Sequence, residues 1–132
     1  MKKLLLLLIT GIFPILTYSQ EGFEYAITGN DVDYYYKMER DVAGYYKDIW
    51  LKYDNPVKKV KTKSGKFVTT GGGYTMAYMT INCPSKSHET KNILVYNSKG
   101  NVIKRDDTPT FSRPIVPGSV IEGIYKKVCA KD

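Results

Sequence analysis

The sequence has little of the residue types that most catalytic and metal sites need. It contains one histidine, His88, and two cysteines, Cys83 and Cys129, in 132 residues. A metal centre or a nucleophile with its base needs several such side chains, and no nucleophile motif is present. The run Gly71–Gly73 lacks the Lys and the Ser or Thr that follow the glycines of a phosphate-binding loop. We therefore predict that the protein is not an enzyme, with no catalytic residues, no metal and no cofactor.

A membrane-spanning segment is also lacking, although one apolar run stands out at the N-terminus. Two lysines precede this run, which covers residues 4–16 and is interrupted by Gly11 and Pro14. A transmembrane helix needs roughly 20 apolar residues, so the run is too short to span a bilayer. Small residues after it favour cleavage after Ser19. We interpret residues 1–19 as a signal peptide and expect export to the periplasm, the cell surface or the medium.

The remaining chain, residues 20–132, has a length that suits one domain with one core. Cleavage removes two of the twenty basic residues and none of the thirteen acidic ones, which leaves a formal charge of +5. A modest basic excess in an exported protein favours contact with anionic surfaces or glycans. Nucleic acid is not expected as a partner, because no nucleic-acid motif is present.

The two cysteines form an even number in a chain bound for an oxidising compartment, which favours a disulfide between Cys83 and Cys129. The alternatives are a metal pair or a reactive thiol. A metal pair needs further ligands, and His88 lies in the polar segment CPSKSHETK, which we interpret as a solvated loop. A structural disulfide is therefore the favoured reading.

The C-terminal segment PGSVIEGIYKKVC predicts a helix. Ser119 and Glu122 have the spacing of a capping box. Apolar residues then recur at helical spacing, at Val120, Ile121, Ile124, Tyr125 and Val128. Cys129 shares that apolar face. Because Cys83 ends the alternating run YTMAYMTINC, a disulfide would fasten this helix to a central strand.

Aromatic residues are concentrated in the segment DYYYKMERDVAGYYKDIWLKY, residues 33–53, which holds six of the twelve tyrosines and the only tryptophan. Side chains alternate between the two faces of a strand. One face is apolar and carries Tyr34, Tyr36, Met38, Tyr45, Ile49, Leu51 and Tyr53. The other carries Tyr35, Tyr46 and Trp50 beside Lys37, Lys47 and Lys52. The cluster fits an ordinary antiparallel sheet, and it also fits an exposed aromatic and cationic binding strip.

Further strand patterns cover residues 74–83 and 93–105, and a basic segment precedes them. This segment, PVKKVKTKSGKFVTTGGG, includes Lys58, Lys59 and Lys61. It fits a solvated hairpin loop, or a contact with sulfated glycans or lipid head groups. The predicted fold class is α+β, with a single antiparallel β-sheet of about five or six strands, over residues 34–105, packed against one C-terminal helix. An edge strand can pair with a second copy, which leaves a monomer and a homodimer both open.

Five elements in this order resemble the surface-adhesin protein E family of exported bacterial domains: YYYK, KDIWLKY, MTINC, ILVYNSKGNVI and IVPGSVIEGIYKKVC. They cover Tyr34 to Cys129. The resemblance implies a small sheet on a C-terminal helix, joined by Cys83 and Cys129, and an adhesin that contacts host proteins.

Together these observations predict an exported, non-enzymatic binding module that contacts a protein or an anionic glycan. The candidate binding residues are Tyr35, Tyr46, Trp50, Lys58, Lys59 and Lys61. The alternative is a periplasmic inhibitor or accessory subunit of one protein partner.

Overall fold

The computed structural model describes residues 22–130, so the predicted signal peptide lies outside the described residues. The elements are β1 (Glu24–Gly29), β2 (Val32–Val42), β3 (Tyr46–Asp54), β4 (Lys58–Lys61), β5 (Phe67–Thr70), β6 (Tyr74–Asn82), β7 (Ser87–Tyr96), β8 (Val102–Asp106), β9 (Arg113–Pro114) and α1 (Val120–Cys129).

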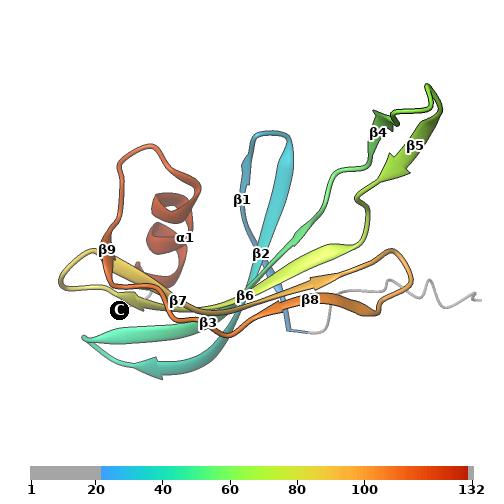
Figure 1. Cartoon of the computed structure of the whole chain (residues 1–132). Coiled ribbons are helices and arrows are strands. Elements are labelled where there is room, and N and C mark those ends of the chain that lie inside the picture. The colour runs from blue at the N-terminus through green and yellow to red at the C-terminus, as the bar shows by residue number, and fades with distance from the viewer. Residues whose placement is uncertain (1–21, 131–132) are drawn as a thin grey trace, which may run out of the picture.

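Seven of these strands form one curled antiparallel sheet with α1 against one of its faces (Figure 1). The strand order is β1-β2-β3-β6-β7-β8, and β9 also pairs with β7. This arrangement confirms the predicted fold class. The sheet is larger than expected because β1 precedes the first predicted strand. Asn30 and Asp31, with φ of 52° and 61°, form the two-residue turn that joins β1 to β2.

The core lies between α1 and residues of β1, β2, β3 and β6. It consists of Ala26, Tyr36, Ile49, Leu51, Ala77, Met79, Ile81, Ile124 and Val128. Ile49 and Ile81 are 0% exposed, as is Ile124 of the helix. The predicted apolar face is therefore the core face, with one exception. Tyr45 is 67% exposed, because it lies in the turn between β2 and β3 rather than in a strand.

Lys47 corrects the sequence interpretation, which placed it beside the exposed aromatic residues. It lies on the core face of β3 between Tyr46 and Asp48, and the residue is fully buried. The aliphatic stem of a lysine packs well among apolar groups while its ammonium reaches a charged partner. Here Nζ lies 2.6 Å from Oδ1 of Asp41, whose side chain is 47% exposed. Lys47 therefore belongs to the packing of the core.

The helix begins at the predicted cap Ser119 and ends at the predicted disulfide, but the Glu122 carboxylate bonds the residue before the cap. The hydroxyl of Ser119 accepts a hydrogen bond from the backbone N–H of Glu122 at 3.2 Å. The Glu122 carboxylate in turn accepts one from the N–H of Gly118, which together with Lys126 lowers the pKa of Glu122. At the other end, Cys129 forms a disulfide with Cys83, with 5.7 Å between the two Cα atoms. In the chain-entropy model such a bond stabilises the fold by about 4 kcal/mol.

His88 also corrects the sequence interpretation, which placed it in a solvated loop. It lies in β7, paired with Ile81 of β6 on one side and Arg113 of β9 on the other. Its side chain is half-buried, and its Nδ1 is buried with no hydrogen-bond partner among the described residues 22–130. Burial, and then the nearby charge of Arg113, lower the pKa of His88.

The core assignment predicts that Ile49→Ala lowers the free energy of unfolding by about 2 to 5 kcal/mol, from lost burial and the cavity that remains. The matched control is Ile103→Ala, because Ile103 lies in the edge strand β8 and is 63% exposed. We expect the control to change stability by less than about 0.5 kcal/mol in urea unfolding. Equal losses for the two variants would contradict the assignment.

The helix cap predicts that Ser119→Ala lowers the free energy of unfolding by about 1 kcal/mol, because the N–H of Glu122 loses its acceptor. Ser98→Ala, in the exposed turn between β7 and β8, is the control and should have almost no effect. Thermal melts of both variants measure the difference. A cap variant as stable as the control would show that this hydrogen bond adds nothing.

The lowered pKa of His88 predicts a loss of stability in mild acid. Above pH about 6.5 the imidazole is neutral in both states, so it adds no pH dependence. Below that pH the unfolded chain binds a proton more readily than the folded one, so stability falls as the pH falls toward the folded pKa. His88 is the only histidine. Urea unfolding on the two sides of about pH 6.5, at about pH 7.5 and about pH 5.5, measures this loss of stability. The loss between the two pH values should be smaller in His88→Gln than in the native chain, and equal losses would refute the assignment.

Candidate functional site

The candidate site is the face of the main sheet that points away from α1, which we call the outer face. Since Ile49 and Leu51 point into the core, their neighbours along β3 point to the outer face. Trp50 and Tyr46 of β3 lie there. Tyr35 of β2, whose cross-strand partner is Lys52, lies there too. All three aromatic residues are half-buried. The structure thus places these three predicted site residues on one surface.

Trp50 forms the centre of the outer face. Its ring packs on that of Tyr78 in β6, with 4.9 Å between the centroids and 42° between the ring planes. On the other side, Lys37 of β2 is its cross-strand partner. Burial, followed by the charges of Asp48 and Glu39, raises the pKa of Tyr78, so its hydroxyl stays protonated at neutral pH. The centre of the face is therefore an aromatic pair with a cation and a hydroxyl beside it.

A second aromatic group lies where β3 ends and β6 begins. Tyr74 stacks on Tyr96 with 4.4 Å between the centroids and 15° between the planes. The ammonium of Lys52 lies 4.3 Å from the centroid of Tyr74 and 5.8 Å from that of Phe23. These distances are within the range of a cation–π interaction. Burial and the neighbouring Tyr96 raise the pKa of Tyr74.

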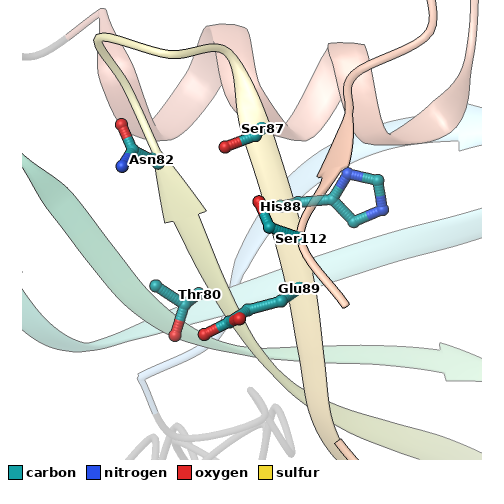
Figure 2. Close-up of a pocket in the computed structure, with 6 residues that line it drawn as sticks. All are labelled: Thr80, Asn82, Ser87, His88, Glu89 and Ser112. Atoms are coloured by element: carbon teal, nitrogen blue, oxygen red, sulfur yellow. The ribbon is translucent and has the colours of Figure 1, made fainter. Parts of the chain in front are cut away.

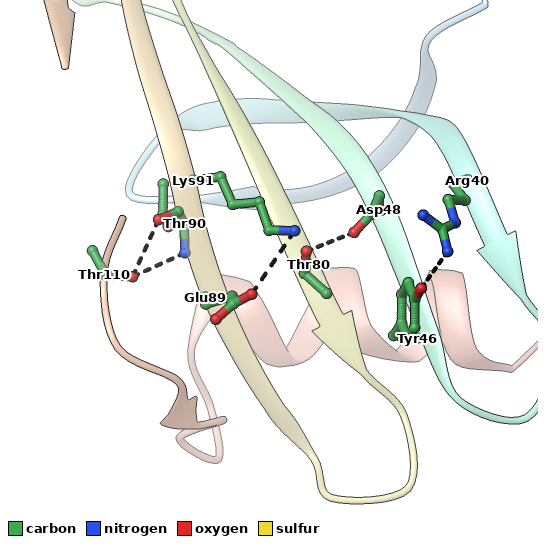
Figure 3. A network of polar contacts seen from close by, with 8 residues as sticks. All are labelled: Arg40, Tyr46, Asp48, Thr80, Glu89, Thr90, Lys91 and Thr110. Carbon is green, nitrogen blue, oxygen red and sulfur yellow. Dashed lines mark hydrogen bonds and ion pairs between the residues drawn. The ribbon is translucent and has the colours of Figure 1, made fainter. Parts of the chain in front are cut away.

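The opposite end of the outer face is polar (Figure 3). Arg40 donates a hydrogen bond to the hydroxyl of Tyr46, and its guanidinium carbon lies 5.2 Å from the centroid of that ring. Thr80 donates to Asp48 at 2.6 Å, which satisfies a carboxylate that is only 4% exposed. The cations and acceptors at this end bind one another, as Arg40 binds Tyr46 and Lys91 pairs with Glu89.

A shallow cavity of about 250 Å³ lies beside this polar end (Figure 2). The imidazole of His88 projects away from Thr80 and Asn82. The cavity is lined by Thr80, Asn82, Ser87, His88, Glu89 and Ser112. Within residues 22–130, no three His, Cys, Asp or Glu side chains are arranged to hold a metal ion.

Lys58, Lys59 and Lys61, the other predicted site residues, do not lie on the outer face. They belong to β4, which pairs only with β5 in a separate two-stranded hairpin. Every residue of both strands is exposed. The predicted site is therefore two surfaces, the outer face and the β4–β5 hairpin.

Three aromatic residues of the outer face were missed as site residues, namely Tyr74, Tyr78 and Tyr96. The alternation of β6 does place Tyr74 and Tyr78 on the face opposite to the buried residues of that strand. The missing information was the pairing, because β6 lies beside β3 only in the folded sheet. From here on, the term aromatic surface means Tyr35, Tyr46, Trp50, Tyr74, Tyr78 and Tyr96.

A family model described as surface-adhesin protein E matches residues 27–130 of the chain. No curated protein matches the chain, and no solved structure matches it. Over residues 22–130, the structure contains no helix with the length and apolar character needed to cross a bilayer.

Proposed function

The chain belongs to the surface-adhesin protein E family, and from this premise we propose that it is an exported, non-enzymatic binding module for a protein or an anionic glycan. The family supports a surface-adhesin-like role in general, and the Cys83–Cys129 disulfide fits an oxidising compartment. The predicted signal peptide at residues 1–19 fits the same location.

The observation that carries this proposal is the aromatic surface, which lies on a sheet face that α1 does not cover. Tyrosine and tryptophan are the residue types most enriched at binding hot spots, because a partner buries much apolar area on a rigid side chain. The pairs Trp50 with Tyr78 and Tyr74 with Tyr96 hold their rings in fixed positions. A partner therefore meets a preorganised surface and loses little entropy in ordering it.

Charge supports an anionic partner. Lys37 and Lys52 border the aromatic centre of the outer face, and Arg40 lies at its polar end. The lysines of the β4–β5 hairpin add further positive charge beyond the end of β3. Such charges raise the rate at which an anionic partner arrives, and the aromatic contacts then determine how long it stays.

We expect Trp50→Ser, Tyr35→Ser and Tyr46→Ser each to weaken binding to an immobilised panel of sulfated glycans and matrix proteins. Loss of a hot-spot aromatic residue costs about 2 kcal/mol of binding, or about thirtyfold in affinity. Tyr45→Ser is the matched control, because Tyr45 is 67% exposed in the adjacent turn. Melting temperatures check that each variant is folded, and Trp50→Ser should lose about 1 kcal/mol of stability with the Tyr78 contact.

Unchanged binding in all three variants would refute the assignment of the aromatic surface. Crosslinking in intact cells tests the alternative role of an inhibitor or accessory subunit. Recovery of one stoichiometric periplasmic protein, with no binding to the glycan and matrix panel, would favour that role over adhesion.

A further inference from the structure

The β4–β5 hairpin continues the strands β3 and β6 but leaves their sheet (Figure 1). Asp54 and Tyr74 form the last pair of the β3–β6 ladder, and the chain then passes through Pro56 on one side and Gly71–Gly73 on the other. All three glycines have positive φ, between 71° and 84°. At Gly73 a Cβ atom would lie 2.0 Å from the carbonyl oxygen of Tyr96, so only glycine fits. These residues direct the hairpin away from the body of the protein.

The hairpin carries charge of one sign. Residues 55–73 contain five lysines, at positions 58, 59, 61, 63 and 66, and no aspartate or glutamate. All five are exposed. A neutral or basic partner gains nothing from this distribution, whereas an anionic surface attracts every one of these side chains.

The hairpin also exposes apolar side chains, which attraction to charge alone does not explain. Phe67 is 70% exposed, Val57 64%, Val60 46% and Val68 43%. Cross-strand partners share a face, so the pair Val60 and Val68 lies on one face of the hairpin, and Phe67 lies with Lys61 on the other. Each face thus presents both apolar groups and lysines.

We propose that the β4–β5 hairpin binds the surface of an anionic lipid bilayer, with its apolar side chains in the head-group region. A protein partner or a glycan chain laid along the hairpin covers one face, and it leaves the apolar groups of the other face in water. The interfacial region of a bilayer surrounds an inserted hairpin on all sides. Lysine stems extend toward the phosphates while the aliphatic and aromatic groups enter the acyl boundary.

The backbone limits how deep the hairpin can go. Each strand pairs with the other along one edge only, so the outer N–H and C=O groups of β4 and β5 need water or head groups as partners. Unpaired backbone groups are very costly in the hydrocarbon region. The contact is therefore interfacial and reversible, and it depends on both anionic lipid and salt.

The test is co-sedimentation of the purified protein with vesicles of phosphatidylglycerol and phosphatidylcholine, and with vesicles of phosphatidylcholine alone. We expect binding to the anionic vesicles only, and weaker binding at high salt. Changing Lys58, Lys59 and Lys61 together to Ser should lower the partition coefficient about a hundredfold, since each cation near an anionic surface contributes about fivefold. Phe67→Ser should lower it about tenfold.

One control variant separates insertion from plain charge attraction, and heparin binding tests the alternative ligand. Phe111→Ser makes the same change at a residue that is 90% exposed but lies outside the hairpin, and it should leave partitioning unchanged. If Phe67→Ser has no more effect than Phe111→Ser, insertion is refuted. Heparin binding that requires the three lysines, without binding to anionic vesicles, would assign the hairpin to sulfated glycans and overturn the proposal.

The lipid contact of the hairpin does not depend on the partner of the aromatic surface, and the same assays test this. Trp50→Ser should leave vesicle binding unchanged, because Trp50 lies on the outer face of the main sheet. Loss of vesicle binding in Trp50→Ser would show that lipid binding requires the aromatic surface, which would overturn the proposal of a separate hairpin contact. Failure on the glycan and matrix panel, with vesicle binding intact, would refute the proposed function and leave the lipid contact standing.

Discussion

The packing of α1 against one face of the sheet is the contact on which the rest of the structure depends. Ile124 and Val128 of the helix are fully buried in one cluster with Ile49 of β3 and Ile81 of β6. The disulfide fastens the last residue of the helix to the end of β6, and the hydroxyl of Tyr125 donates to the carbonyl oxygen of Cys83 at 3.1 Å. Because one short helix covers only one face, the other face must be stable in water. In an antiparallel sheet this division is the usual one, with alternate residues buried.

The outer face meets that requirement through contacts among its own side chains. Tyr78 covers part of Trp50, Tyr96 covers part of Tyr74, and Lys52 lies over the Tyr74 ring. These contacts reduce the apolar area in water, and they leave rings that remain only half-buried. The same arrangement therefore stabilises the sheet and provides a rigid surface for a partner, so the two readings of the tyrosine cluster are not exclusive.

Alternation along each strand predicted the two faces, since it depends only on backbone geometry. It failed where the backbone departs from a regular strand. Tyr45 lies in a turn, and a register shift between Met38 and Arg40 interrupts β2. Lys47 was misplaced for another reason: it alternates in phase with Ile49, and its charge concealed a core position where Asp41 is its partner. The first strand was missed, although Asn30 and Asp31 suit a two-residue turn. The placement of His88 required the pairing of β7 with β9, which links distant segments and has no local signal.

The two candidate surfaces are joined through one pair of strands, because the β4–β5 hairpin follows β3 and precedes β6 in the chain. Lys52 and Tyr74 lie at the end of β3 and the start of β6, just before the chain enters the hairpin. The segments around Pro56 and Gly71–Gly73 break the ladder there, so β4 and β5 contribute nothing to the main core. Substitutions in the hairpin should therefore change binding without changing the stability of the sheet, as expected for sites without shared contacts. The chain can thus hold its aromatic surface fixed on a disulfide-linked core while the hairpin contacts a second, anionic surface beyond the same end of the sheet.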